Sequence, residues 1–240
     1  GKPLHESQWL INHARAVKNR VPSAKEEGVL ILEGSASMFW ELQYGSVMVP
    51  EMVHAIQPAA KFVVMVRDPA ERLYSDYIYF SYRTAFQKHM DTKKFKYNPE
   101  GFHLAVLQSI EEMNRCLKDH PSRICAWEQR RYQPVTQIQL GMYSEFVETW
   151  LRYFPSDQLK VVRMEDLTEE PRAFFDSVTN FVGLSRLTDV QLFGEEGKQV
   201  KKSNGGRKRE VMLPATRALL DEFYAPYAAK LAKMVGNPLL

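Results

Sequence analysis

The stretch KFVVMVRDPAERLYSDY (residues 61–77) joins an apolar run directly to a helix start. The run FVVMV is short and rich in β-branched residues, which predicts a buried strand. Asp68, Pro69 and Glu71 follow in the order expected of an N-cap, a first helical residue and a capping-box glutamate. We therefore predict a strand over 61–66 that passes at once into a helix.

Arg67 and Ser75 are not explained by this helix start. Arg67 stands just ahead of a helix N-terminus, where free backbone N–H groups and the helix dipole favour an anion. Its guanidinium can donate two parallel hydrogen bonds to a phosphate. Ser75 follows Asp68 by two helical turns, so we expect it on the same face as the cap. An arginine and a hydroxyl over one crevice predict a site for a phosphomonoester.

Beyond this corner, short apolar runs alternate with amphipathic segments. This alternation predicts one α/β domain over residues 1–240, with a parallel sheet and crossover helices. The expected strands are 28–34, 61–66 and 158–166; the expected helices are 6–19, 50–58, 70–84, 101–118, 143–154, 171–184 (ending at Gly183) and 212–235; the expected loops are 86–100 and 197–210.

The totals are those of an ordinary globular domain. The 240 residues are 45% hydrophobic and 25% charged, with a formal net charge of +3. So small a charge gives no argument for nucleic acid as a partner, and no apolar run is long enough to cross a membrane. The histidines are scattered without the spacing of a metal site. No secretory signal is visible, and Gly1 in place of Met favours a chain cut from something longer.

The two cysteines, Cys116 and Cys125, leave two interpretations open. A disulfide between them would close a small loop and contribute roughly 2–3 kcal/mol. Two reduced thiols in a cytosolic protein are as compatible with the composition.

The strand, Arg67, the Asp-Pro pair and Ser75 together resemble the segment of sulfotransferases that binds the 3′-phosphate of PAPS (3′-phosphoadenosine 5′-phosphosulfate), which implies phosphate contacts for both side chains. LGMYSEFVETWLRYFP (140–155) resembles the Gly-x-Tyr and Trp-Leu-x-x-Phe helix of Golgi carbohydrate sulfotransferases. In that family the helix lies close to the nucleotide, so the resemblance nominates Tyr143. Its other apolar residues are expected in the core: Phe146, Trp150, Leu151 and Phe154.

The basic segment KQVKKSNGGRKRE (198–210) carries paired glycines. A charge run is usually a solvated surface, but glycines let the backbone approach a ligand closely. In heparan-type sulfotransferases a similar loop closes over the PAPS phosphates. That resemblance implies donor contacts for Lys202, Gly206 and Arg207.

LILEGSASMFW (30–40) resembles the E-x-S-A-S strand and turn of N-acetylgalactosamine 4-sulfate 6-O-sulfotransferases, the subfamily most similar over residues 25–235. Heparan 3-O-sulfotransferases carry a lysine after the glutamate of this turn. Here the position is Gly34, so that catalytic lysine cannot be carried over. Ser35 and Ser37 could contact ligand or cap the turn.

One family element is missing from the sequence. No Pro-Lys-x-Gly-Thr-Thr loop for the 5′-phosphosulfate occurs in residues 1–240, and the glutamate base of heparan-type members would lie upstream. The catalytic residues therefore remain unknown. We expect truncation or cleavage of a longer protein. A companion chain that supplies the loop, or a non-catalytic relative that lacks it, would also leave the sequence without this element.

The resemblance implies a P-loop NTPase-like sulfotransferase fold, a central parallel sheet flanked by helices. It further implies PAPS as donor, no metal, and the Golgi lumen, with any membrane anchor outside this chain. The expected acceptor is a sulfated glycosaminoglycan, at the 6-O of 4-sulfated N-acetylgalactosamine in chondroitin or dermatan sulfate. An oxidising lumen would favour the Cys116–Cys125 disulfide.

Two other functions remain open. One is a binding module for a nucleotide or a sulfated glycan, without turnover. The other is a sulfotransferase for a small molecule or for protein tyrosine. The basic residues expected to steer a polyanionic acceptor are Lys88, Lys93, Lys94, Lys96, Arg130 and Arg131.

Overall fold

The computed structural model describes residues 32, 34, 38–40, 43–44, 47–80, 96–127, 136–194 and 210–236. The helix predicted over 6–19, most of the strand predicted over 28–34 and most of both predicted loops lie outside these residues. Leu32, which belongs to that predicted buried strand, is described. It has no strand pairing there and its side chain is exposed, so the prediction is wrong at this residue.

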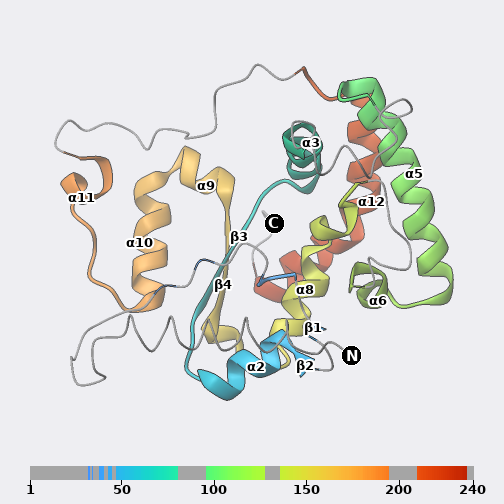
Figure 1. Cartoon of the computed structure of the whole chain (residues 1–240). Helices are drawn as coiled ribbons and strands as arrows, with labels where there is room; N and C mark the ends of the chain where they lie inside the picture. The colour runs from blue at the N-terminus through green and yellow to red at the C-terminus, as the bar shows by residue number, and fades with distance from the viewer. Residues whose placement is uncertain are drawn as a thin grey trace, which may run out of the picture.

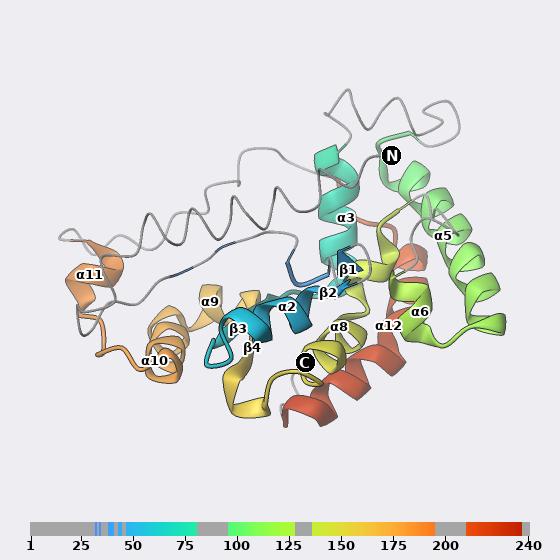
Figure 2. The same cartoon turned by 60° about the horizontal axis from the view of Figure 1, so that its bottom comes forward.

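Two parallel strands lie at the centre of the described structure. β3 (Phe62–Val66) pairs with β4 (Leu159–Arg163), with Phe62 opposite Leu159 and Val66 opposite Arg163. Both views place α9 and α10 on one side of this pair, and α3, α8 and α12 on the other (Figures 1 and 2). The predicted parallel sheet flanked by helices is confirmed, and both strands end at the same edge of the sheet.

The predicted helices mostly form within a few residues of their expected bounds. The helices are α2 (Val49–Ile56), α3 (Pro69–Phe80), α5 (Pro99–Asp119), α6 (Ser122–Trp127), α8 (Tyr143–Trp150), α9 (Met164–Glu169), α10 (Pro171–Val182), α11 (Asp189–Phe193) and α12 (Pro214–Val235). Shorter elements are β1 (Gln43–Tyr44), β2 (Val47–Met48) and the 3₁₀ turns η1 (Ile138–Gly141) and η2 (Ser156–Gln158).

Two predicted elements are too long. The strand expected to reach residue 166 ends at Arg163, because Glu165 and Asp166 form the acidic first turn of α9. The helix expected to reach residue 154 ends at Trp150. The backbone there tightens, since the N–H of Tyr153 donates to the carbonyl of Trp150 three residues back, just before a proline that disfavours helix.

The core lies between α3, α5, α8 and α12. Leu73 and Tyr77 of α3 are buried there, with Phe146, Trp150 and Phe154 from the α8 segment, which were predicted to lie in the core. Cys116 and Cys125 form a disulfide that joins the end of α5 to α6, which confirms the pairing implied by the family resemblance. Within the described residues, no helix is both long enough and apolar enough to cross a membrane.

Candidate anion-binding site

The corner between β3 and α3 is built as its sequence predicts. Asp68 Oδ1 accepts a hydrogen bond from the backbone N–H of Glu71 at 2.8 Å, so Asp68 is the N-cap of α3. The capping box differs from the prediction. The backbone N–H of Asp68 donates to Glu165 Oε1 at 3.1 Å, which ties this corner to the carboxyl end of β4.

A cavity of about 360 Å³ opens at the carboxyl ends of both strands. Its wall consists of residues 66–69 at the corner, Gly141 of η1 and Tyr143 of α8, Arg163 of β4 and Glu165 of α9, and part of α12. This is where open α/β sheets bind ligands, and the volume suits a small molecule. The α12 residues in the wall are Asp221, Tyr224, Ala225, Tyr227, Ala228 and Leu231.

The structure brings together two of the residues nominated from sequence. Arg67 and Tyr143, far apart in the chain, line the same cavity. Ser75 is half-buried on α3 and is not among the lining residues. Lys96 is exposed. The other nominated residues lie outside the described part of the chain: Ser35, Ser37, Lys88, Lys93, Lys94, Arg130, Arg131, Lys202, Gly206 and Arg207.

Two arginines in the cavity wall hold their carboxylate partners loosely. Arg67 lies 3.7 Å from Glu71, and Arg163 lies 3.7 Å from Asp166 and 4.0 Å from Glu165. These distances exceed those of hydrogen bonds, so both guanidinium groups can turn their donors to a ligand. The cavity therefore offers two cations at the carboxyl ends of adjacent strands.

A third arginine lies behind the wall and is firmly held. Arg72 donates to Asp76 Oδ2 at 2.5 Å and to the carbonyl of Gln137 at 2.9 Å. Burial by itself lowers the pKa of Arg72, but the phenols of Tyr224 and Tyr143 and the Asp76 carboxylate more than offset this and raise it. Arg72 thus keeps a fixed positive charge beneath the two tyrosines of the wall.

The tyrosines of the wall are neutral hydrogen-bonding groups. Burial raises the pKa of Tyr143, Tyr224 and Tyr227, that of Tyr227 to about 12, so all three remain protonated at neutral pH. The Tyr224 hydroxyl donates to the carbonyl of Ile138 at 2.7 Å. A Cβ on Gly141 would lie 2.6 Å from the Tyr224 ring, so glycine is needed there for close packing. In the Gly-x-Tyr motif, the glycine leaves room for the ring of Tyr224, and the tyrosine, Tyr143, lines the cavity.

Sequence reasoning missed Arg163, although a signal was present. In both VVMVR and LKVVR an arginine directly follows a short apolar run. Because parallel strands end at one edge of a sheet, two such arginines are expected near one another. Tyr224 and Tyr227 had no comparable signal, because their place depends on how α12 packs.

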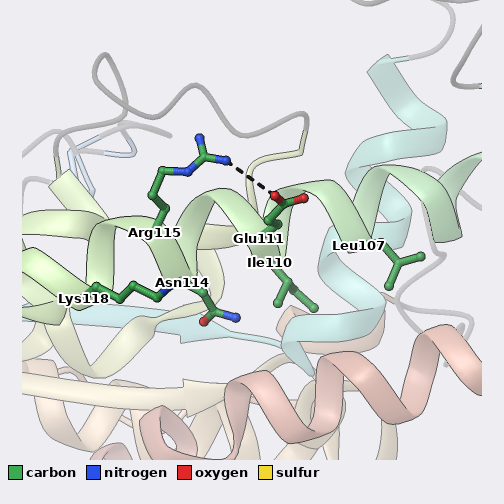
Figure 3. A pocket seen from close by; sticks show the side chains of 6 residues that line it. All are labelled: Leu107, Ile110, Glu111, Asn114, Arg115 and Lys118. Atoms are coloured by element: carbon green, nitrogen blue, oxygen red, sulfur yellow. Dashed lines mark ion pairs between the residues drawn. The ribbon is translucent and has the colours of Figure 1, made fainter.

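A second hollow, of about 350 Å³, lies on the outer face of α5 (Figure 3). Its lining residues in the described part of the chain all come from that one helix, and Arg115 is engaged with Glu111 and Glu112 of the same helix. It lacks convergent groups from other elements, which a specific small-molecule site requires.

Residues 48–193 match the Sulfotransferase domain family, and the chain belongs to that family. It is 28% identical to mouse carbohydrate sulfotransferase 15 over 230 residues, covering 89% of this chain and 39% of that protein. It is 27% identical to mouse heparan sulfate glucosamine 3-O-sulfotransferase 3A1 over 228 residues, covering 88% of this chain and 49% of the relative. The chain thus spans less than half the length of these two relatives.

A solved structure has the same fold. The sulfotransferase of Alicyclobacillus acidocaldarius superposes with a TM-score of 0.59 over 94% of this chain and 71% of that one. The two sequences are 18% identical over this match. The sulfotransferase fold, with parallel strands flanked by helices, is therefore the fold of this chain.

Proposed function

We propose that this chain belongs to a PAPS-dependent sulfotransferase and contains the part that holds the donor nucleotide. One observation carries the proposal: Arg67, nominated from the phosphate-binding motif, lines a strand-end cavity with its guanidinium only loosely paired. Membership of the sulfotransferase family and similarity to two glycan sulfotransferases support it.

The proposed reaction is an in-line sulfuryl transfer. The acceptor hydroxyl oxygen attacks the sulfur of PAPS, the bond from sulfur to the bridging phosphate oxygen breaks, and PAP (3′-phosphoadenosine 5′-phosphate) leaves. The hydroxyl proton passes to a base that we do not assign. Arg67 holds the 3′-phosphate and so fixes the donor in register, while Tyr143 bounds the nucleotide. Lys202, Gly206 and Arg207 contact the donor phosphates.

The proposed acceptor is a sulfated glycosaminoglycan, at the 6-O of 4-sulfated N-acetylgalactosamine in chondroitin or dermatan sulfate. The resemblance of the 30–40 segment to that subfamily supports the choice. The proposed compartment is the Golgi lumen, which agrees with the Cys116–Cys125 disulfide. The 5′-phosphosulfate loop comes from an upstream segment or a companion chain.

Calorimetric titration with PAP, beside AMP, tests the nucleotide site. We expect PAP to bind more tightly than AMP, because only PAP carries the 3′-phosphate. Arg67→Ala should lower the affinity for PAP about 10- to 100-fold, which is the size expected when a charge-assisted interaction is lost, and should change the affinity for AMP little. Arg186→Ala, at an exposed arginine far along the chain, is the matched control and should bind like wild type. Equal binding of PAP and AMP by the wild type would refute the site.

Turnover of labelled PAPS tests the reaction. The protein should include the upstream segment, and the acceptors should be chondroitin 4-sulfate, heparan sulfate, a tyrosine peptide and a simple phenol. Transfer to chondroitin 4-sulfate alone is the expected result. PAP binding without transfer to any acceptor would favour a non-catalytic module. Transfer to the peptide or phenol would favour a different acceptor class.

A further inference from the structure

Arg217, in the first turn of α12, makes short contacts with two carboxylates of the cavity wall. Its Nη2 donates to Asp68 Oδ2 at 2.7 Å, and its Nε lies 2.7 and 2.9 Å from the two carboxylate oxygens of Asp221. Arg217 itself is not among the lining residues, whereas both aspartates are. An arginine outside the cavity therefore engages two of the carboxylates that face it.

These contacts converge on the residue that follows Arg67. One carboxylate oxygen of Asp68 caps α3 through the Glu71 N–H, and the other is held by Arg217. The backbone N–H of Asp68 is held by Glu165. Asp68 is thus fixed by α3, α12 and α9 together. Because its backbone continues directly from Arg67, these contacts also fix where the Arg67 side chain begins.

The charges of the wall give Arg217 a second effect. Asp68, Glu165 and Asp221 line the cavity beside the two loosely paired arginines, and each carboxylate opposes the binding of a phosphate. The positive charge of Arg217 offsets the negative charges of Asp68 and Asp221, which reduces their repulsion of a phosphate in the cavity. Its hydrogen bond to Asp221 and the charge of Asp68 raise the pKa of Arg217, so its guanidinium stays charged at neutral pH.

We propose that Arg217 is a positioning residue for the nucleotide site: it orients Asp68 beneath Arg67 and cancels wall carboxylates that would repel the 3′-phosphate. The proposal rests on the proposed function, because it takes the ligand to be a nucleotide with a 3′-phosphate. Arg217 acts through Asp68 and Asp221 and does not touch the ligand.

Titration of the Arg217→Gln variant with PAP and AMP is the first test. PAP affinity should fall about tenfold, as expected when one charge-assisted interaction near a binding group is lost. AMP affinity should fall less, since AMP has no 3′-phosphate. The control is Arg115→Gln, which removes an arginine with intrahelical acidic partners on α5 and should leave both affinities unchanged. Thermal unfolding of each variant reports its folding.

A second variant predicts a change of opposite sign. Asp221→Asn removes a carboxylate from the cavity wall and leaves Arg217 bound to Asp68. PAP should therefore bind about threefold more tightly, which is the size expected for an exposed charge interaction. The effect should be clearest at low salt, where charges are least screened. A purely structural ion pair predicts unchanged or weaker binding instead. The side chain of Asp221 is 52% exposed, so this variant should fold. Combined with Arg217→Gln, it should recover part of the lost affinity.

The outcomes separate the two proposals. If the wild type binds PAP and Arg217→Gln binds it equally tightly, the role of Arg217 is overturned and the proposed function stands. Absence of PAP binding by the folded wild type overturns both. If Arg217→Gln does not fold, Asp221→Asn decides, and failure to tighten PAP binding overturns the role.

Discussion

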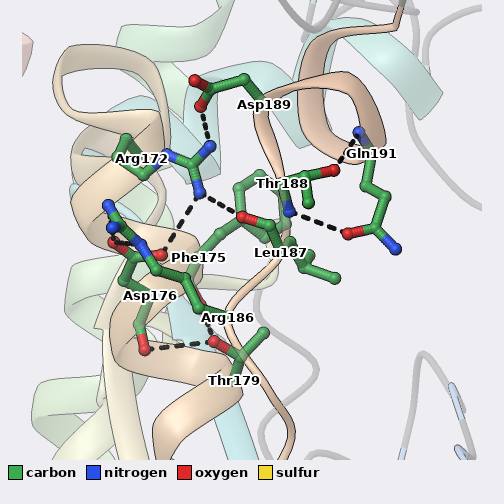
Figure 4. Close-up of polar contacts among 9 residues, drawn as sticks. All are labelled: Arg172, Phe175, Asp176, Thr179, Arg186, Leu187, Thr188, Asp189 and Gln191. Carbon is green, nitrogen blue, oxygen red and sulfur yellow. Dashed lines mark hydrogen bonds and ion pairs between the residues drawn. The ribbon is translucent and has the colours of Figure 1, made fainter.

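Arginines gather around carboxylates in two regions of this molecule, the strand-end cavity and the α10–α11 connection. In the second region Arg172 of α10 donates to the carbonyl of Leu187 at 2.5 Å and contacts the carboxylates of Asp176 and Asp189 (Figure 4). Arg186 lies 3.0 Å from Asp176. These are nearly all hydrogen-bond distances, so the guanidinium donors are used in joining the two helices.

The cavity region uses its arginines in two ways. Arg72 and Arg217 are held at 2.5–2.9 Å, like the arginines of the α10–α11 connection. Arg67 and Arg163 line the cavity, and the carboxylates nearest to them in the described part of the chain are 3.7 Å away. An anion site is therefore indicated by loosely paired donors that line a hollow, and the number of arginines alone would not distinguish the two regions.

The largest expected effect concerns the buried arginine. Arg72→Met should lower the free energy of unfolding at pH 7 by about 3 kcal/mol, because Asp76 would remain in a partly buried site without its partner. Arg172→Met, at the surface connection, should cost about 1 kcal/mol or less. Urea unfolding of both variants measures the difference. Equal losses would show that the two regions do not differ in this respect.

The pH dependence of Arg72→Met sharpens this result. Burial raises the pKa of Asp76 even with Arg72 present. A carboxyl group whose folded pKa lies above its unfolded value favours folding at low pH, and that contribution is lost as pH rises through the folded pKa. Without Arg72 the pKa should rise further. The deficit of the variant should therefore shrink as pH falls from 7 towards 4, and a deficit that stays constant would contradict this prediction.

Replacing a glycine should have a different physical consequence in each of the two regions. Gly141→Ala should destabilise by about 2 kcal/mol through overpacking, because the new Cβ would meet the Tyr224 ring. It should also weaken PAP binding, since Tyr224 lines the cavity. Gly183 ends α10 at φ 82° in open space, so Gly183→Ala should cost about 1 kcal/mol of backbone strain without affecting PAP. Urea unfolding and PAP titration of both variants check these predictions. Normal PAP binding by Gly141→Ala would show that the Gly-x-Tyr motif does not shape the nucleotide site.

The last prediction concerns PAP binding by Arg163, the second arginine of the cavity wall. Arg163→Ala should reduce PAP affinity about tenfold, the lower end for a charge-assisted contact, with little change in stability because its ion pairs are long. Arg186→Ala serves again as control. Loss of stability without loss of PAP affinity would place Arg163 with the structural arginines of the α10–α11 connection.

Local patterns carried most of what could be predicted from sequence. A β-branched run, an acidic cap and a proline specify the β3–α3 corner within a few residues, so Arg67 and the cap Asp68 were found without a structure. The predicted bounds failed where local preferences overlap. Glu165 and Asp166 follow an apolar run directly, but they favour the start of a helix. Phe154 continues a helical pattern of apolar residues, but the backbone there tightens before a proline. Ser75 has the expected spacing, yet its place on α3 does not bring it into the cavity wall.

The sequence by itself determined the parallel α/β class, the strand-to-helix corner, the Gly-x-Tyr segment and the resemblance that linked them to a sulfotransferase. Only the tertiary structure decided which residues share the cavity. Strand register sets Arg163 beside Val66, and the packing of α12 brings Tyr224 against Gly141 and Arg217 onto Asp68. These pairings join residues far apart in the chain. They depend on the closure and packing of the whole domain, which no local propensity encodes.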